Sequence, residues 1–178
     1  IRFAAEIDCP MVDTVDGAFE IEGLSRDEVF RITCDNDRQV LPWAEDYGVI
    51  INVEPHGPYT TDVHFMRRLF ETFDSEYLRL NMDTGNTFIA GQDPVAFLKR
   101  HAEKVEHVHV KDVSESLAAA VRGEQTGIAV SQCAIGDGVN RDNIRRVLSI
   151  LKDRGYDGVL SMECEGQGGP MIEKSLNW

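Results

Sequence analysis

The feature that most constrains this chain is an alternation between apolar segments that end on a polar side chain and amphipathic segments that begin with a helix cap. The ends of four apolar segments are Glu54, Asp83, His109 (or Lys111) and Glu163. Strands that alternate with helices of 10 to 20 residues are typical of parallel β-α-β units. The sequence therefore predicts an α/β fold with a parallel sheet and no internal domain boundary.

Caps and apolar runs place the expected elements along the chain. Strands are expected at 10–13, 49–54, 78–83, 105–111 and 158–163, and helices at 25–46, 61–73, 93–104, 140–154 and after 170. Ser25 and Glu28 form a capping box at the start of the first of these helices. Pro42 should bend or break this helix, because an internal proline removes a backbone hydrogen bond.

Composition and charge narrow the class of protein. The chain has 178 residues, is 42% hydrophobic and has a net charge of −13. Such an acidic surface argues against nucleic acid or an anionic membrane as a partner. No apolar run approaches the roughly 18 residues of a membrane span, and no targeting signal is visible, although the chain begins with Ile1. The four cysteines are expected to be reduced, as in a cytoplasmic protein.

The strand ends share a further pattern, because residues two apart in a strand lie on the same face. The resulting pairs are Asn52 with Glu54, Asn81 with Asp83, His107 with His109, and Ser161 with Glu163. A buried polar face is costly unless a partner satisfies it. Three carboxylates and one imidazole suit Mn²⁺, Mg²⁺ or Co²⁺, and also Zn²⁺. The carboxyl ends of parallel strands, where such a site would lie, are where α/β proteins commonly bind ligands.

Four motifs together resemble a known superfamily. The segments NVEPHG, NMDTGN, HVHVKD and GYDGVLSMECEG are similar, in this order, to the xylose isomerase-like TIM barrels. That superfamily contains sugar phosphate isomerases and epimerases, including ketose 3-epimerases, hydroxypyruvate isomerases and inosose dehydratases. The resemblance implies a (β/α)₈ barrel and one divalent metal ion, with Mn²⁺ as the first choice. It implies that the metal ligands are Glu54, Asp83, His109 and Glu163.

The resemblance also implies a reaction and its catalytic residues. Glu54 and Glu163 would act as acid and base on a sugar or related polyhydroxy carbonyl compound. The metal would stabilise an enediolate during isomerisation or epimerisation. A dehydratase that acts on a cyclic polyol or keto-sugar at the same site is the first alternative. A phosphodiesterase similar to endonuclease IV ranks last of the three, because it needs several metals, more histidines at strand ends and a basic groove. Four ligands at strand ends argue against a non-enzymatic binding barrel.

The length of the chain is short for this fold. A complete barrel of this type needs about 250 residues or more. If Glu54 ends the fifth strand, the chain supplies only strands four to eight, and residues 1–178 form a single partial-barrel domain. Exposed strand edges then predict that the chain is not a stable monomer, and a homo-oligomer is one solution.

Other residues are expected around the metal site. Expected substrate contacts are His56, Asn86, Lys111 and Glu165. Alternatives remain for three of them: His56 as an exposed turn residue, Lys111 as a rim lysine, and Glu165 as a support behind Glu163. Asn86 replaces the histidine that ketose 3-epimerases often have there. Among the other histidines, His64 and His101 are expected on helix surfaces, and His107 in the core below the metal.

Two loops are candidates for functional roles. The stretch 112–139 is too long for an ordinary connection, so it is expected to be a mobile lid near the carboxyl ends of the strands, with a short helical piece near 117–121. Within and after it, the segment AIGDGVN at 134–140 should cover the site. The glycine-rich segment GQGGP at 166–170 could form an anion-binding nest.

Overall fold

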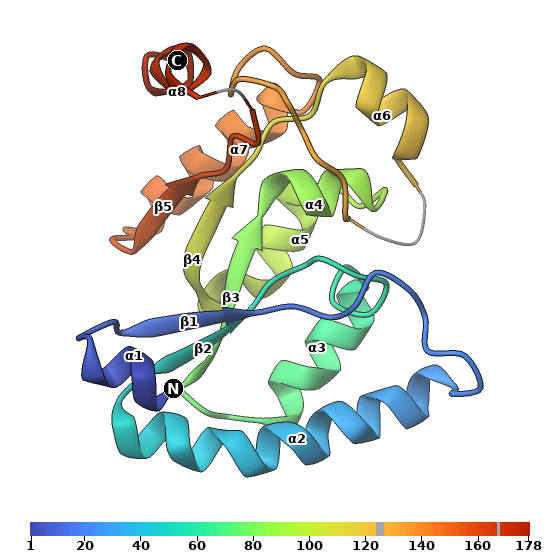
Figure 1. Cartoon of the computed structure of the whole chain (residues 1–178), viewed down its shortest axis with the longest axis vertical. Helices are drawn as coiled ribbons and strands as arrows, with labels where there is room; N and C mark the ends of the chain where they lie inside the picture. The colour runs from blue at the N-terminus through green and yellow to red at the C-terminus, as the bar shows by residue number, and fades with distance from the viewer. Residues whose placement is uncertain (124–126, 167) are drawn as a thin grey trace.

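The computed structural model contains a curved sheet of five parallel strands with helices packed against one of its faces (Figure 1). It describes residues 1–123, 127–166 and 168–178. The strands are β1 (Met11–Thr14), β2 (Ile50–Val53), β3 (Leu78–Asp83), β4 (Val105–Val110) and β5 (Val159–Met162). They follow one another across the sheet in chain order, and each pairs in parallel with the next. The predicted parallel sheet is confirmed.

Helices follow the strands in the alternation that the sequence predicts. They are α1 (Arg2–Glu6), α2 (Arg26–Tyr47), α3 (Val63–Thr72), α4 (Thr84–Ile89), α5 (Pro94–His101), the 3₁₀ helix η1 (Ala102–Lys104), α6 (Glu115–Val121), α7 (Arg141–Asp153) and α8 (Gly169–Leu176). In Figure 1, α2 runs along the β1 end of the molecule and α8 lies at the β5 end. No helix in the described parts of the chain is both long and apolar enough to cross a membrane.

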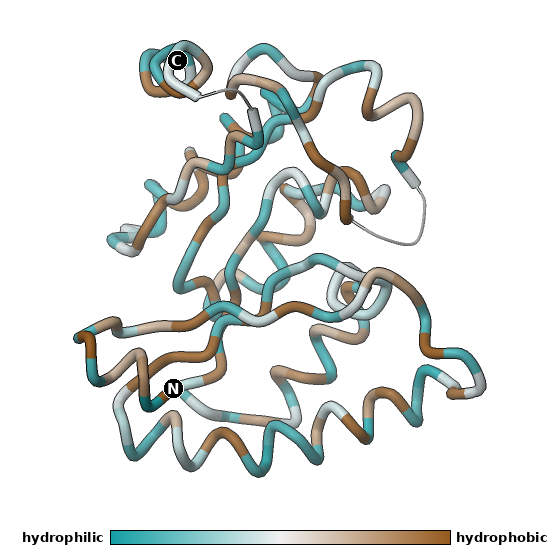
Figure 2. The backbone as a smooth tube through the Cα atoms, in the orientation of Figure 1, coloured by the Kyte–Doolittle hydropathy of each residue, from teal (hydrophilic) through white to brown (hydrophobic). Residues whose placement is uncertain are grey.

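The long helix α2 has the expected capping box and continues through Pro42 without a break. The Ser25 hydroxyl accepts a hydrogen bond from the Glu28 backbone N–H, and the Glu28 carboxylate accepts one from the Ser25 backbone N–H. The capping box is therefore present. Pro42 does not break the helix, which continues to Tyr47. Because Pro42 is exposed, water can hydrate the carbonyl that loses its partner. Figure 2 shows hydrophobic and hydrophilic residues alternating along α2, as expected when one helix face meets the core.

The hydrophobic core lies between the sheet and its helices. Strand side chains on this side include Leu78, Leu80, Met82 and Val108, all fully buried. They belong to one cluster with Met66 and Leu69 of α3, Leu98 of α5, and Ile144 and Val147 of α7. Burial of each such side chain contributes about 1.5–3 kcal/mol. The apolar face therefore fixes the sheet against α3, α5 and α7 and leaves the other face for polar side chains.

His101 is a correction, because it is not the surface residue that the sequence suggested. It is only 5% exposed, and its ring packs against Phe97 at 4.9 Å and Phe70 at 5.8 Å between centroids. Its spacing of four from Phe97 places both on the core face of α5. Burial, followed by the nearby Arg100 charge, lowers the pKa of His101 to about 4.

Acid should therefore destabilise this fold through His101. The folded pKa lies below the ordinary value of 6.5, so this stability is complete above pH 6.5 and is lost as pH falls through 4. The expected loss is at most about 3 kcal/mol. Urea unfolding at several pH values should show a flatter profile over this range for His101→Met than for the natural protein. Parallel profiles would contradict the assignment.

Candidate metal centre

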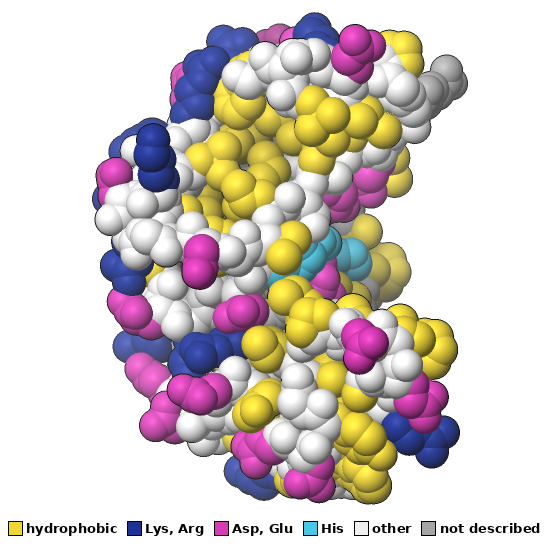
Figure 3. Space-filling view, turned by 90° about the vertical axis from the view of Figure 1, so that its left-hand side faces the viewer, with side chains coloured by type: hydrophobic (Ala, Val, Ile, Leu, Met, Phe, Trp, Pro, Cys, Tyr) yellow, Lys and Arg dark blue, Asp and Glu magenta, His cyan; other side chains and the backbone are white. Residues whose placement is uncertain are grey.

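The four predicted ligands come together at the carboxyl edge of the sheet. Glu54 follows β2 directly, Asp83 ends β3, His109 lies near the end of β4, and Glu163 follows β5. One potential ligand atom from each lies within 4.8 Å of those of the other three. Figure 3 shows histidine side chains beside acidic ones in the recess between the upper and lower parts of the molecule. Four strands that are separate in sequence thus supply one polar cluster.

The imidazole of His109 is central to this cluster. Its Nδ1 lies 3.5 Å from Glu54 Oε2, 3.8 Å from Asp83 Oδ2 and 3.3 Å from Glu163 Oε2. Asp83 is completely buried, and the side chains of His109 and Glu163 are 20% and 27% exposed. The cluster is therefore shielded from water on the Asp83 side and open toward Glu163.

The donor set of this cluster fits a divalent cation. Asp83 Oδ2, His109 Nδ1 and Glu163 Oε2 are buried and have no hydrogen-bond partner among the described residues, although they converge on each other. Buried polar atoms in this state require compensation. Three carboxylate oxygens and one imidazole nitrogen are ligands that Mn²⁺, Mg²⁺, Co²⁺ and Zn²⁺ accept.

The pKa values of the cluster respond to the crowding of three carboxylates. Burial, with the Glu163 charge added, raises the pKa of Asp83 well above its usual value. Burial alone would lower the pKa of His109, but the nearby carboxylates of Glu163, Glu54 and Asp83 raise it to about 10. Burial acts to raise the pKa of Glu163, but contacts with His109, Asp83 and Lys111 bring it well below its usual value.

Asparagine side chains hold Glu54 in place. Asn86 Nδ2 donates to Glu54 Oε1 at 2.9 Å, and Asn81 Nδ2 donates to Oε2 at 3.3 Å. Asn86 belongs to α4, which the sequence did not predict, and Asp83 caps this helix by accepting from the Asn86 backbone at 2.6 Å. Asp83 thus uses Oδ1 to begin α4 and leaves Oδ2 in the cluster. Asn86, an expected substrate contact, lies against a predicted ligand.

Lys111 and Glu165 lie on the other side of the cluster, beside Glu163. Lys111 Nζ is 3.0 Å from Glu163 Oε1 and 3.1 Å from Glu165 Oε2. Lys111 is only 3% exposed, so the alternative interpretation of Lys111 as a lysine on the rim of the site is wrong. Burial acts to lower its pKa, but Asp83 and Glu163 raise it above the ordinary value. Lys111 therefore links Glu163 to Glu165, and the contact of Lys111 and Glu165 with substrate stays a prediction.

His56 lies in a turn whose backbone is hydrogen-bonded to the carboxylate of Asp16. Asp16 accepts hydrogen bonds from the backbone of Gly57, Tyr59 and Thr60 at 2.6–3.1 Å. The His56 backbone donates to the Thr60 hydroxyl at 2.8 Å. This turn lies directly after Glu54, so Asp16 fixes the chain where it leaves the cluster. The role of Asp16 could not be predicted from the sequence, because its partners are more than 40 residues away along the chain.

Below the four ligands lies a second polar layer. His107 is 8% exposed, which confirms it as a core histidine. Its Nδ1 is 3.1 Å from Asp13 Oδ2 and its Nε2 is 2.6 Å from Ser161 Oγ. Asp13 also lies 3.9 Å from His109 Nε2. Asp13 was not among the predicted site residues, although it ends the first predicted strand, and it lies one residue before the end of β1.

The long segment after β4 is partly anchored. Asp112 accepts from the backbone of Gly136, Gly138 and Asn140 at 2.9–3.1 Å, so 136–140 is fixed beside the end of β4. The Gly127 backbone donates to the His56 carbonyl at 2.7 Å, so the segment also reaches the end of β2. It therefore lies near the carboxyl edge, as expected, and includes α6 at Glu115–Val121.

Three expectations about the loops stay untested. The mobility of 112–139 is one, and its residues 124–126 lie outside the described residues. The described hydrogen bonds of 134–140 include those to Asp112, to the backbone carbonyls of Thr84 and Lys111, and to Ser175 of α8, and none of them goes to a predicted ligand. The suggested anion nest at 166–170 includes residue 167, which also lies outside the described part.

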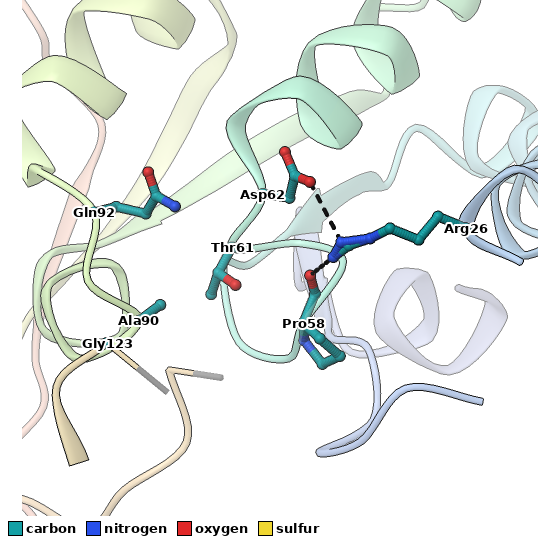
Figure 4. A pocket seen from close by; sticks show the side chains of 7 residues that line it. All are labelled: Arg26, Pro58, Thr61, Asp62, Ala90, Gln92 and Gly123. Carbon is teal, nitrogen blue, oxygen red and sulfur yellow. Dashed lines mark hydrogen bonds and ion pairs between the residues drawn. The ribbon is translucent and has the colours of Figure 1, made fainter. Parts of the chain in front are cut away.

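A separate polar cavity of about 230 Å³ lies near the start of α3. Figure 4 shows Arg26 pointing across it to the Pro58 carbonyl and Asp62, with bonds of 2.6 and 3.4 Å. None of its lining residues belongs to the four-ligand cluster. Because the guanidinium of Arg26 is already paired with protein atoms, this cavity offers no reactive group comparable to the strand-end cluster.

The fold and the cluster together define a class of protein. The family model described as xylose isomerase-like TIM barrel matches residues 1–178. The chain belongs to this family, which confirms the resemblance seen in the four sequence motifs.

Individual relatives refine this result. An inosose dehydratase from Clostridium beijerinckii is 27% identical over 147 residues, which cover 78% of this chain and 48% of the relative. The chain spans about half the length of the curated relatives it matches. A D-tagatose 3-epimerase-like protein has a TM-score of 0.79 at 24% identity, with 99% of this chain and 62% of the other covered. The IolI protein with a bound zinc atom has a TM-score of 0.78 at 19% identity, with 99% and 63% covered. The two structures establish the fold as a partial TIM barrel.

Proposed function

We propose that this protein is a divalent-metal-dependent isomerase or epimerase that acts on a sugar or related polyhydroxy carbonyl compound. One observation carries the proposal: Glu54 and Glu163 each direct an oxygen toward His109 Nδ1, at 3.5 and 3.3 Å. They come from β2 and β5, which flank β3 and β4 in the sheet. Two glutamates so arranged can bracket a substrate held at the cluster.

The residues of the cluster would have different roles in such a reaction. Glu54, Asp83, His109 and Glu163 would hold the cation. When bound, the cation supplies positive charge where negative charge develops on the substrate oxygen. One glutamate removes the proton beside the carbonyl, and the other returns a proton to the enediolate. Asn86 and Lys111 hold the remaining oxygens of Glu54 and Glu163 and so fix the two carboxylates before substrate arrives.

A dehydratase on the same residues is the second candidate. It begins with the same proton removal but expels a β-hydroxyl group as water. The name inosose dehydratase on several curated relatives favours it, at 27–33% identity over part of this chain. Replacement of the expected substrate histidine by Asn86 also weakens the ketose 3-epimerase subtype.

The metal and the partners follow from the same cluster. Mn²⁺ is our first choice, and the zinc atom in the IolI structure keeps Zn²⁺ among the candidates with Mg²⁺ and Co²⁺. The partner would be a small sugar-like molecule, with His56 and Glu165 as further contacts. We propose that residues 1–178 act as one domain. A phosphodiesterase is disfavoured by the net charge of −13.

Product analysis separates the two candidate reactions. The protein loaded with Mn²⁺ is incubated in D₂O with an inosose and, separately, with ketohexoses. An epimerase should incorporate deuterium beside the carbonyl and give an isomer of equal composition, whereas a dehydratase should give a product that lacks one water by mass spectrometry. Samples treated with a chelator are the control. Activity that persists unchanged after complete metal removal would contradict both candidates.

A further inference from the structure

Lys111 is one of the most enclosed charged residues of the described chain. It is 3% exposed, and its ammonium contacts Glu163 Oε1 at 3.0 Å and Glu165 Oε2 at 3.1 Å. A buried ammonium is stable only when it is paired and hydrogen-bonded. Its position is therefore set by these two carboxylates, and theirs by it.

The contact divides the two oxygens of Glu163 between different partners. Oε1 receives the Lys111 ammonium, whereas Oε2 lies 3.3 Å from His109 Nδ1 and has no hydrogen-bond partner among the described residues. Only Oε2 is left facing the cluster. A cation there would meet Glu163 through one oxygen, because the other is already bound to a positive charge.

Glu54 differs from Glu163, because both of its oxygens accept hydrogen bonds. Its Oε1 accepts from Asn86 Nδ2 at 2.9 Å, and its Oε2 accepts from Asn81 Nδ2 at 3.3 Å and also lies 3.5 Å from His109 Nδ1. The partners of Glu54 are neutral amides, whereas the partner of Glu163 is an ammonium. The ammonium adds a charge–charge attraction that the amides cannot supply, so only Glu163 has an oxygen committed to a positive charge of the protein.

The surroundings of Lys111 fix its side chain along its length. The Lys111 backbone donates to the Thr84 hydroxyl at 3.0 Å. Its methylene groups pack so closely on Gly85 that a side chain at residue 85 would overlap them. At the far end, Glu165 accepts from the Ser131 backbone at 2.6 Å. Residues from β3–α4, from the segment after β4 and from the chain after β5 thus converge on one lysine.

We propose that Lys111 is a positioning residue that restricts Glu163 to one cation-facing oxygen, with Glu165 and Ser131 as its support. The inference rests on the metal centre of the proposed function. It differs from a role in which Lys111 touches an anionic substrate, because the ammonium is occupied by Glu163 and Glu165. It also differs from a purely structural role, because it predicts a change in how a metal ion is coordinated.

The test compares Mn²⁺ bound to the natural protein and to Lys111→Met. Loss of the ammonium frees Oε1, so the low-temperature electron paramagnetic resonance spectrum of bound Mn²⁺ should change. Because a positive charge near the cation disappears, the affinity measured by calorimetry should stay equal or become up to about tenfold tighter. Lys152→Met, which alters an exposed lysine of α7, should leave both measurements unchanged.

Results of the Lys111→Met experiment that differ from this expectation would be interpreted as follows. An unchanged spectrum, or an affinity weaker than that of the natural protein, overturns the proposal. If Lys111→Met does not fold, Lys111→Met with Glu165→Gln removes the charge pair together, and the same criteria apply. Asp83→Asn is measured in parallel: if it binds Mn²⁺ as tightly as the natural protein, the metal centre itself is wrong and the Lys111 proposal falls with it. If Asp83→Asn weakens binding but Lys111→Met keeps the natural spectrum, only the Lys111 proposal is overturned.

Discussion

Replacing either Glu54 or Glu163 by glutamine should reduce turnover by about 10²–10⁴-fold, the usual contribution of a general acid or base. Glutamine keeps the size of the side chain and one oxygen that can face the cluster, but it cannot carry the proton. The fold should be unaffected, because both residues lie after their strands and not in the hydrophobic core. Steady-state rates with the substrate found by product analysis provide the measurement.

The two variants should differ when deuterium exchange is followed in D₂O. The variant that lacks the initial base should not exchange the substrate C–H proton, whereas the other can exchange it without forming product. Glu71→Gln, which alters an exposed carboxylate of α3, is the matched control and should retain full activity. Full turnover and exchange in both Glu54→Gln and Glu163→Gln would show that these residues do not carry the proton.

Replacing Asp83 by asparagine should weaken divalent-metal binding at least about 100-fold. Loss of a residue that only hydrogen-bonds to a metal ligand typically weakens binding about 10–100-fold, and loss of a ligand should exceed this. The backbone should remain in place, because asparagine can still accept from Asn86 at the start of α4. Since burial disfavours the ionised carboxylate, metal-free Asp83→Asn should be at least as stable as the natural protein. Calorimetric titration with Mn²⁺ and thermal unfolding test the two parts.

A matched control distinguishes the role of Asp83 as a metal ligand from its role as a helix cap. Asp93 caps α5 as Asp83 caps α4, but it is exposed and lies outside the cluster. Asp93→Asn should therefore bind Mn²⁺ as the natural protein does. Equal loss of binding in both variants would indicate damage to the fold, and undiminished binding in Asp83→Asn would remove Asp83 from the site.

The strand framework could be predicted from the sequence because its signals are local. Apolar runs of strand length, bounded by caps such as Ser25 and Asp93, place all five strands within a few residues of their observed bounds. Because Glu54 and Asp83 stand at the carboxyl ends of parallel strands, they are then placed at the same edge of the sheet. Nothing in that reasoning required distances between elements.

The parts that escaped prediction depend on contacts between distant segments. Helix α4 begins directly at the end of β3 with Thr84, Gly85 and Asn86, residues that favour turns over helices. Without α4, the bond from Asn86 to Glu54 could not be foreseen. Burial of Lys111 likewise depends on Glu165, 54 residues further along the chain, whose backbone partner is Ser131.

The most direct test of the metal centre is anomalous scattering from crystals of the protein grown or soaked with Mn²⁺. The account predicts one strong peak at about 2.0–2.4 Å from Glu54, Asp83, His109 Nδ1 and Glu163 Oε2, the range of metal–oxygen and metal–nitrogen bonds. Crystals of Asp83→Asn should show this peak greatly weakened at the same Mn²⁺ concentration. A peak elsewhere, or none in crystals of the natural protein at saturating Mn²⁺, would contradict the claim that these four strand ends form one metal centre.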